Sequence, residues 1–371
     1  MAEPLPSVLH VVTPHSWRGG EQQAAYLMEE LQAIDVRQHM VCSKGSAMEK
    51  HCREHQFPMS AFPRKSSFSW SFARQLARIQ KSFQPTVVHV HGSHAHTFAV
   101  MAATLFGCRA PIVVSRRVDF PISNSLLSKY KYNHHQVAKI ICVSDAIREI
   151  TARGLKNPEI LTTVHSGIDL SRFQPEQKGT TLRETYHVPQ EHALIGNVAA
   201  LAPHKDYFTF VDTVELLVAE NLPATFFIIG TGPMEEEVRS YVKSKGLENA
   251  ILFTGFRKDI PQILPELDVF LISSETEGLG TSILDALACK VPVVATNAGG
   301  IPEIILHQKT GWLGKVKNPK SLAEGVKTLL HDAGLRQQLV DGGWQHLKQF
   351  DKATTARKTL EIYQRVIGES G

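Results

Sequence analysis

Short apolar runs rich in Val and Ile alternate with amphipathic segments along the chain, and this alternation limits the fold more than any other feature. Because most of these runs lack the alternating polarity of half-exposed strands, they predict parallel strands covered by helices on both faces. The predicted strands lie at residues 8–12, 36–41, 87–91, 111–115, 139–144, 193–201, 224–230, 250–255, 268–273 and 291–296. The pattern therefore predicts an α/β protein with doubly wound parallel sheets.

The strand–helix pattern is interrupted by a polar segment at residues 162–192, which contains Gly and Pro and predicts a linker. A chain of 371 residues is long enough for two domains. We therefore expect a first Rossmann-like domain over residues 1–185 and a second over residues 186–350. Residues 321–367 are predicted to be helical, with breaks at Gly334, Gly342 and Gly343.

The composition excludes several classes of protein. Hydrophobic residues make up 43% and charged residues 20%, which is typical of a globular protein. No apolar run reaches the roughly 18 residues of a membrane-spanning helix, and the N-terminal sequence lacks the pattern of a signal peptide. The five cysteines are scattered and form no CxxC pair, which favours reduced thiols in a cytoplasmic protein.

Charge is unevenly distributed along the chain. Residues 1–185 contain 22 Lys and Arg against 14 Asp and Glu, an excess of eight, whereas the remainder contains 18 against 22. A basic first half indicates an anionic substrate or surface, although chance differences between solvated faces explain the asymmetry equally well. Nucleic-acid binding is not expected, because no basic block is interleaved with aromatic residues.

Ligands of doubly wound sheets bind where strands end, so the residues after each strand are the candidates for a site. After the first strand, Arg18, Gly19 and Gly20 precede a predicted helix. Paired glycines allow an anion to approach the backbone, and the helix N-terminus favours negative charge. A simple helix-entry turn explains the glycines as well, and the dinucleotide fingerprint GxGxxG is absent.

The segment from residue 89 to residue 96 contains four histidines, at positions 89, 91, 94 and 96. In a strand, His89 and His91 share a face, but no acidic or thiol partner lies nearby in the sequence, so we expect no metal. A hydrogen bond from His91 to substrate is favoured, with His94 as a further candidate, and His89 is equally consistent with a packed core residue.

Basic residues follow two further predicted strands and are also candidates for the site. Arg116 and Arg117 directly follow a strand and are suited to clamp a phosphate or carboxylate, unless one is solvated and the other pairs with Asp119. Lys205 follows the first strand of the second domain, where an ammonium group neutralises a departing diphosphate.

The most specific pattern spans residues 274–286. A strand ends, Glu277 meets the Gly278–Leu279–Gly280 turn, and a helix begins near Thr281. The glycine backbone and the helix dipole predict a phosphate site. Asp285 follows eight residues after Glu277 and is expected two turns into the helix on the same face. Carboxylates beside a phosphate site are suited to bind sugar hydroxyls.

At this pattern the sequence resembles the retaining glycosyltransferases of the GT-B fold in glycosyltransferase family 4 (group 1), whose hallmark is Glu-x7-Glu. The resemblance covers nearly the whole chain. Its motifs are Gly19-Gly20, His89-Val90-His91, Val143-Ser144, Gly167-Ile168-Asp169, Phe173, Lys205, Gly230-Thr231-Gly232-Pro233, Gly255-Phe256, Glu277-x7-Asp285, Pro292-Val293-Val294 and Gly299-Gly300-Ile301-Pro302-Glu303.

The resemblance implies two Rossmann-like domains facing across a cleft, with residues 351–371 forming a helix that returns to the first domain. It also implies catalytic roles, in which Glu277 contacts the donor sugar, Lys205 stabilises the departing diphosphate and His91 reaches the sugar. The implied nucleotide-binding residues are Gly19, Gly20, Gly232, Phe256, Arg257, Gly278, Leu279, Gly280, Thr281 and Asp285. Arg18, His94, Arg116 and Arg117 remain candidates for the acceptor or phosphate.

The implied reaction is metal-independent transfer of a sugar from a nucleoside diphosphate sugar, by default a UDP-sugar, to a hydroxyl acceptor, with no further cofactor. A glycolipid or surface polysaccharide is the expected acceptor, and the basic first domain suits peripheral contact with the inner face of a membrane. Two positions depart from the family: Asp285 replaces a glutamate, and Ala200 replaces the usual arginine. Ala200 leaves open a catalytically weak nucleotide-sugar-binding subunit, and a GT-B sugar-nucleotide epimerase is a further alternative.

Overall fold

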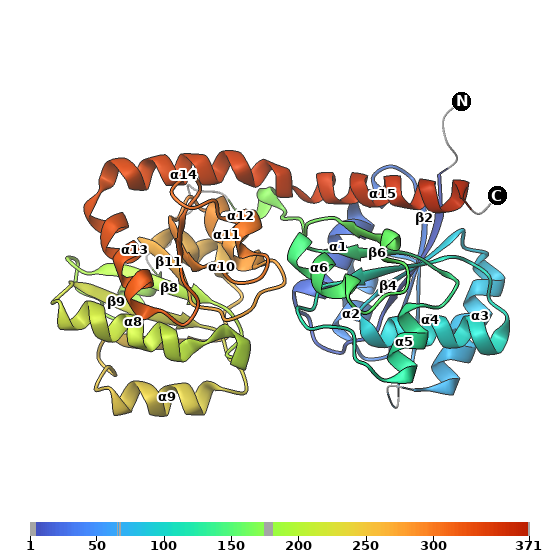
Figure 1. Cartoon of the computed structure of the whole chain (residues 1–371), viewed down its shortest axis with the longest axis horizontal. Coiled ribbons are helices and arrows are strands. Elements are labelled where there is room, and N and C mark those ends of the chain that lie inside the picture. Colours follow the sequence, from blue (N-terminus) through green and yellow to red (C-terminus); the bar gives the residue numbers. More distant parts are fainter. Residues whose placement is uncertain (1–4, 65, 67, 174–180, 370–371) are drawn as a thin grey trace. The chain divides into compact units, whose positions relative to one another are not determined.

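The computed structural model describes residues 5–64, 66, 68–173 and 181–369, which form two α/β units (Figure 1). Unit 1 contains the chain up to Gly167 together with the chain from Lys352 onward, and unit 2 runs from Ile168 to Asp351. The predicted boundary after residue 185 is therefore too late, because residues 168–173 and 181–185 belong with unit 2. Residues 174–180 of the predicted linker lie outside the described residues.

Unit 1 contains a parallel sheet with the strand order β3-β2-β1-β4-β5-β6-β7. The strands are β1 (Ser7–Val12), β2 (Arg37–Ser43), β3 (Met59–Phe62), β4 (Val87–His91), β5 (Ile112–Arg116), β6 (Val137–Cys142) and β7 (Leu161–Thr163). The helices are α1 (Gly19–Gln32), α2 (Ala47–Glu54), α3 (Trp70–Phe83), α4 (Ser93–Phe106), α5 (Leu126–Tyr132), α6 (Asp145–Ala152), α15 (Lys352–Gly368) and the 3-10 helix η1 (Pro158–Ile160).

Unit 2 contains a parallel sheet with the order β10-β9-β8-β11-β12-β13. The strands are β8 (Ala193–Val198), β9 (Ala224–Ile229), β10 (Ile251–Gly255), β11 (Val269–Ile272), β12 (Val293–Thr296) and β13 (Trp312–Gly314). The helices are α7 (Thr181–Thr185), α8 (Tyr207–Ala219), α9 (Glu235–Ser244), α10 (Ile260–Ile263), α11 (Thr281–Ala288), α12 (Ile301–Ile304), α13 (Pro319–His331) and α14 (Ala333–Leu347), with 3-10 helices η2 (Leu170–Arg172), η3 (Pro203–Lys205), η4 (Leu264–Glu266) and η5 (Lys348–Phe350).

The predicted α/β class with doubly wound sheets is confirmed, and each predicted strand region forms a strand. The sequence did not predict β3, β7 and β13, which lie at sheet edges. Edge strands are less completely covered, so their sequences need not be apolar runs; the residues of β3 and β7, for example, are only half-buried.

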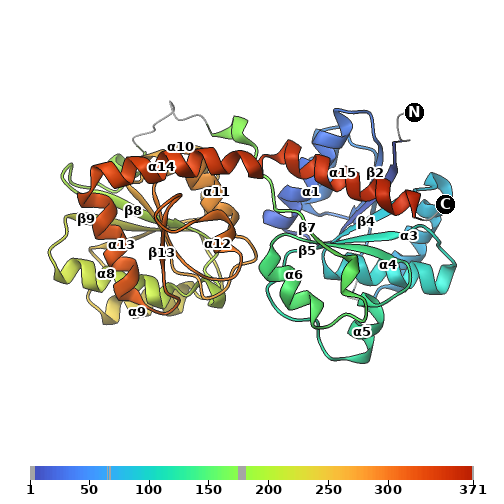
Figure 2. The ribbon, with the colours of Figure 1, turned by 45° about the horizontal axis from the view of Figure 1, so that its top comes forward.

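The last helix belongs to the core of unit 1. Helix α15 packs on α1, and the Tyr363 side chain is fully buried with Leu27 and Leu31 of α1. Figure 2 shows α15 and α1 on one side of the unit 1 sheet and α4 and α5 on the other. The sheet is therefore covered on both faces, as its apolar strands require.

The helical C-terminal region differs from the prediction at two glycines. Helix α14 continues through Gly342 and Gly343, and the chain leaves the helix only at η5. A Cβ on Gly342 would lie 2.0 Å from the Lys309 carbonyl oxygen, and one on Gly343 would lie 2.7 Å from Leu287 Cδ2. The glycines therefore permit close packing of α14 and do not mark a break. Within the described residues, no helix is both long and apolar enough to cross a membrane.

Candidate functional site

The strand order of unit 2 reverses between β8 and β11, which is the place where doubly wound sheets bind ligands. Lys205 ends η3, which follows β8, and Glu277 lies in the turn that follows β11. Because β8 and β11 are neighbours, these two residues, 72 positions apart, come into contact.

The half-buried Lys205 and the buried Glu277 form an ion pair. Lys205 Nζ donates a hydrogen bond to Glu277 Oε1, and Ser274 Oγ donates to the same oxygen at 2.8 Å. The Lys205 side chain is 16% exposed and that of Glu277 is 7% exposed. Each charge compensates the other, and removing one partner would leave a buried charge uncompensated.

Hydrogen bonds between the two loops fix the position of Lys205. Ser273 Oγ donates to the Asp206 carbonyl oxygen at 2.9 Å, and the Glu275 N–H donates to the His204 carbonyl oxygen at 2.8 Å. Asp206 also caps α8, since its Oδ1 accepts from the Thr209 N–H at 3.2 Å. Hydrogen bonds to the residues before and after Lys205 thus fix the backbone that carries its ammonium group.

The glycine turn after Glu277 has the backbone geometry that the sequence predicts. Gly280 has a φ of +87° and directly precedes α11, whose first residue is Thr281. Gly299 packs against Glu277, because an added Cβ would lie 2.1 Å from the Glu277 carbonyl oxygen. Gly278 and Thr281 are half-buried and Leu279 is buried. Because the first N–H groups of a helix lack the usual partner four residues earlier within the helix, the start of α11 is suitable for a phosphate.

Asp285 lies closer to the start of the helix than predicted. Helix α11 begins at Thr281, so Asp285 is just over one turn into it and Glu277 lies outside it. The expectation that both lie on one helix face is therefore wrong. Burial raises the pKa of Asp285 to about 7, and the positive charge of Arg172 opposes this shift.

Three further predicted residues of unit 2 have distinct environments. Gly232 packs on the loop after β8, since an added Cβ would lie 2.3 Å from the Leu201 carbonyl oxygen; this contact alone explains the glycine. Phe256 follows β10 and is 70% exposed. Arg257 Nε donates to Asp259 Oδ1 at 2.8 Å, and this ion pair raises the pKa of Arg257.

In unit 1, the strand order reverses between β1 and β4, and the predicted residues lie at or after the ends of these two strands and of the neighbouring β5. Helix α1 begins at Gly19, and the Arg18 N–H donates to Glu21 Oε2 at 3.0 Å. A Cβ on Gly20 would lie 3.8 Å from Arg117 Cδ, which is an ordinary contact. Neither backbone strain nor crowding requires glycine at position 20, which favours a role in ligand approach.

His91 ends β4 and contacts a histidine that the sequence analysis missed. His10 Nδ1 and His91 Nε2 lie 3.1 Å apart, because β1 pairs with β4 so that His10 is opposite His89, two residues before His91. Among the described residues, His10, His89 and His91 form the one group whose ligand atoms, within 4.8 Å of one another, could hold a metal. His89 is already bonded to Tyr363 and Ser115. Burial lowers the pKa of all three histidines, that of His10 to about 4, so the rings are neutral.

The two predicted arginines have different roles. Arg116 is buried, and its Nε, Nη1 and Nη2 donate to Thr151 Oγ1 (2.7 Å), Tyr132 OH (2.7 Å) and the Phe120 carbonyl oxygen. Arg116 therefore connects segments within unit 1. It is neither a free clamp for an anion nor a solvated or Asp119-paired surface residue, which were the expected alternatives. Arg117 Nε is buried and has no hydrogen-bond partner in the described part of the chain. Burial lowers the pKa of Arg117 to about 10, and Glu21 opposes the shift.

The remaining candidates of unit 1 are at its surface. Arg18 and His94 are exposed. Burial of part of the His94 ring lowers its pKa, as do the positive charges of Arg64 and Lys131.

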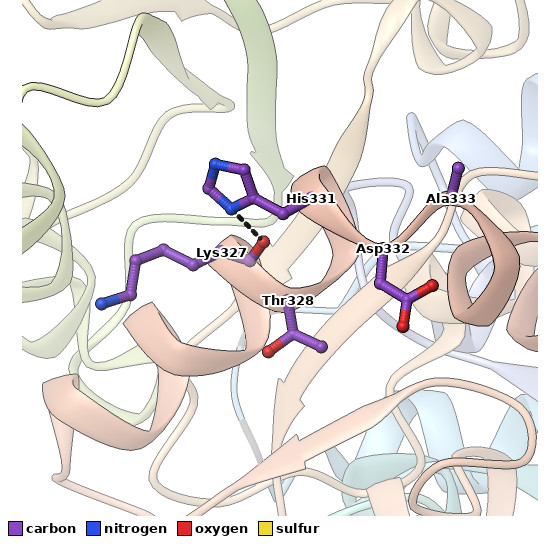
Figure 3. A pocket seen from close by; sticks show the side chains of 5 residues that line it. All are labelled: Lys327, Thr328, His331, Asp332 and Ala333. Atoms are coloured by element: carbon purple, nitrogen blue, oxygen red, sulfur yellow. Dashed lines mark hydrogen bonds between the residues drawn. The ribbon is translucent and has the colours of Figure 1, made fainter.

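A separate shallow hollow lies where α13 ends and α14 begins (Figure 3). His331 Nδ1 lies 2.8 Å from the Lys327 carbonyl oxygen, and Thr328, Asp332 and Ala333 complete the lining. None of the residues predicted for the site lines it, so this hollow is not part of the candidate site.

Comparison with protein families gives two matches that together cover most of the chain. Residues 17–172 match the family described as Glycosyltransferase Family 4, and residues 180–346 match the family described as Glycosyl transferases group 1. The matched ranges carry the candidate residues of unit 1 and unit 2, respectively.

Among curated proteins, the chain is 26% identical over 319 residues to the N-acetyl-alpha-D-glucosaminyl L-malate synthase of Bacillus anthracis, covering 84% of this chain and 82% of the relative. It is also 26% identical over 297 residues to an Escherichia coli enzyme named UDP-Gal:alpha-D-GlcNAc-diphosphoundecaprenol alpha-1,3-galactosyltransferase, covering 75% and 76%. Among solved structures, Anabaena HepE in complex with UDP and glucose superposes with a TM-score of 0.83 at 20% identity, covering 96% of this chain and 99% of HepE.

Proposed function

Since this chain belongs to the group 1 glycosyltransferases of family 4 and has their GT-B fold, we propose that it transfers a sugar from a nucleoside diphosphate sugar to a hydroxyl acceptor with retention of configuration. The observation that carries the proposal is the Lys205–Glu277 pair beside the glycine turn of α11. A half-buried cation and a buried carboxylate are thereby held in position for a diphosphate and for sugar hydroxyls.

In the proposed reaction, the bond from the sugar C1 to the diphosphate breaks and a bond from C1 to the acceptor oxygen forms. A donor phosphate oxygen takes the acceptor's proton, so no separate general base is needed. Lys205 and the N–H groups at the start of α11 stabilise the charge that develops on the diphosphate, without a metal. Glu277 accepts hydrogen bonds from the sugar hydroxyls.

The remaining residues are assigned to the nucleotide. Asp285 contacts the ribose, and the exposed Phe256 borders the base. Gly19 and Gly20, which begin α1, are assigned to the diphosphate as well. UDP is the favoured nucleotide, supported by the structures of HepE with UDP-glucose and with UDP and glucose.

The proposed acceptor is linked to lipid, and a surface of unit 1 supports this. Helices α3, α4 and α5 adjoin one another in Figures 1 and 2, and we call their outer face the α3–α5 surface. Helix α3 contains three Lys or Arg and α5 contains two, and the three helices contain no Asp or Glu. An apolar groove in this surface is lined by Phe68, Trp70, Thr97, Val100, Met101, Thr104, Leu105, Leu127, Ser128, Tyr130 and Lys131.

Exposed apolar side chains surrounded by positive charge match the interface of an anionic membrane. Leu126 is 86% exposed, Leu127 66% and Trp70 62%. We expect the protein to sediment with vesicles that contain phosphatidylglycerol and less with neutral phosphatidylcholine vesicles. Trp70→Ser with Leu127→Ser should weaken sedimentation about tenfold or more, because two large apolar contacts are lost. Leu306→Ser, on an exposed leucine of unit 2, is the control; equal loss there would contradict the assignment.

Nucleotide release from UDP-, GDP- and ADP-sugars tests the enzymatic proposal. Lys205→Ala and Glu277→Gln should each lower release from the preferred donor by roughly 100-fold or more, as expected when transition-state charge loses its partner. Glu275→Gln is the matched control, because Glu275 lies in the same loop but pairs with Lys317 at the surface.

Other outcomes would replace the proposal. Tight donor binding without release, even with membrane extracts as acceptor source, would identify a nucleotide-sugar-binding subunit, the alternative that Ala200 favours. An isomerised donor without transfer would identify an epimerase.

A further inference from the structure

A series of buried hydrogen bonds connects helix α1 with His91 at the end of β4. The Gln38 amide nitrogen donates to the Met28 carbonyl oxygen at 3.0 Å. Gln38 Oε1 lies 3.0 Å from His10 Nε2, and His10 Nδ1 lies 3.1 Å from His91 Nε2. The three side chains are buried. Their hydrogen atoms must therefore be arranged so that every contact joins a donor to an acceptor.

The Met28 carbonyl sets the direction of the whole series, because a carbonyl oxygen can only accept. It requires the amide NH₂ of Gln38 on its side, which leaves Gln38 Oε1 to face His10. Oε1 also only accepts, so His10 Nε2 carries the proton. His10 is neutral near pH 7, because burial lowers its pKa to about 4, and its Nδ1 is then a lone pair.

The same reasoning fixes the ring of His91. Since His10 Nδ1 accepts, His91 Nε2 donates and carries the single proton of a neutral ring. His91 Nδ1 is consequently a lone pair. This atom is buried and has no partner in the described part of the chain, so an acceptor is left unused at the carboxyl end of β4. A buried acceptor without a donor is unfavourable, and a ligand hydroxyl at this position would satisfy it.

We propose that Gln38 and His10 are positioning residues that keep His91 protonated at Nε2, so that His91 Nδ1 accepts a hydrogen bond from a hydroxyl of the donor sugar. The inference rests on the proposed function, which supplies the sugar.

The neighbouring His89 shows why this arrangement is specific. His89 contacts the hydroxyl groups of Tyr363 (2.5 Å) and Ser115 (2.8 Å), and each hydroxyl can donate or accept. The contacts of His89 therefore fix neither tautomer. Only the series that starts at a backbone carbonyl has a fixed direction.

A metal would require the opposite arrangement. An ion bound between His10 and His91 would use the lone pairs of His10 Nδ1 and His91 Nε2, and the proton of His91 would move to Nδ1. The tautomer of His91 therefore distinguishes the two possibilities, and it can be measured without any substrate.

Long-range ¹H–¹⁵N spectra of the full chain labelled at histidine nitrogens test the proposal, with His91→Gln used to assign the signals. At neutral pH, His91 should show a protonated Nε2 and an unprotonated Nδ1, and Gln38→Leu should convert this signal to a mixture of tautomers. Ser60→Ala, which removes the partner of the adjacent His39, should leave His91 unchanged. A proton on His91 Nδ1 in the wild type, with or without added Zn²⁺, would overturn the proposal, as would an unchanged tautomer in Gln38→Leu.

Kinetics give a second readout. Gln38→Leu should lower kcat for release of UDP from UDP-glucose, UDP-galactose or UDP-N-acetylglucosamine by about threefold to tenfold, the value of one neutral hydrogen bond. The change should fall on kcat more than on KM, and it should vanish in the background of His91→Gln. An equal loss in that background would contradict the positioning role. If no donor is turned over, the proposed function fails, whereas the spectra still decide the tautomer.

Discussion

Lys205 and Glu277 are the central residues of the candidate site, and each charge is stabilised by the other. Asp285 differs from them, because burial raises its pKa to about 7 while the charge of Arg172 only opposes the shift. The sequence indicated that Asp285 is a site residue but not that its pKa is raised. The pKa depends on burial and on Arg172, which lies 113 positions away in the chain.

The raised pKa of Asp285 has a consequence for stability. Between the ordinary pKa of about 4 and the folded value of about 7, the folded state binds more protons than the unfolded state, so this group lowers stability as pH rises. Asp285→Asn should therefore be more stable than the wild type at pH 8, by about 1–3 kcal/mol after allowance for solvent screening. The two proteins should converge near pH 4. Urea unfolding across this range measures the difference, and a constant offset at all pH values would contradict the assignment.

At the scale of elements, the strands that the sequence predicted are those that lie inside the sheets, together with the edge strand β10. The edge strands β3, β7 and β13 have only three or four residues, and β3 and β7 are only half-buried, so no long apolar run marks them in the sequence. The prediction of a helix break at Gly342 was wrong. Glycine disfavours helix locally, but here it allows α14 to pack closely on the Lys309 carbonyl, a contact that only the fold reveals.

Two glycines of α14 provide a matched test of this packing. Gly342→Ala should destabilise the protein by about 2–4 kcal/mol, since the added Cβ would lie 2.0 Å from the Lys309 carbonyl oxygen. Gly334→Ala, whose added Cβ would lie at an ordinary 3.4 Å from Asp332 Oδ1, should stabilise it by about 0.5–1 kcal/mol. Chemical denaturation of both variants measures the difference. Equal effects would show that helix propensity, not packing, governs these positions.

At the scale of the whole molecule, the two units each have a core of their own, and the C-terminal helix belongs to the core of the first. The sequence indicated two α/β domains because the strand pattern restarts after the linker. It also predicted Lys205, Glu277 and His91 as site residues, and each of them ends a strand or lies in the segment that follows one. His10 and Gln38 could not be found in this way, because their roles arise from the pairing of β1 with β4 and β2.

The place of α15 in unit 1 predicts that its loss affects one unit only. Tyr363→Ala should destabilise unit 1 by about 3–5 kcal/mol, because a fully buried aromatic ring leaves a cavity. Unit 2 should unfold as in the wild type. Scanning calorimetry measures the two transitions, with Arg357→Ala on the exposed face of the same helix as control. A matching loss in both transitions would contradict the division into units.

The central claim is that Lys205 and Glu277 act together in sugar transfer, and a double-mutant cycle on nucleotide release measures this most directly. The wild type, Lys205→Ala, Glu277→Gln and the double variant are compared on the donor that the wild type prefers. Because the two side chains act together, we predict that each single variant lowers the rate of nucleotide release by roughly 100-fold or more and that the double variant lowers it little further. Release at the wild-type rate in either single variant, or losses that multiply in the double variant, would contradict it.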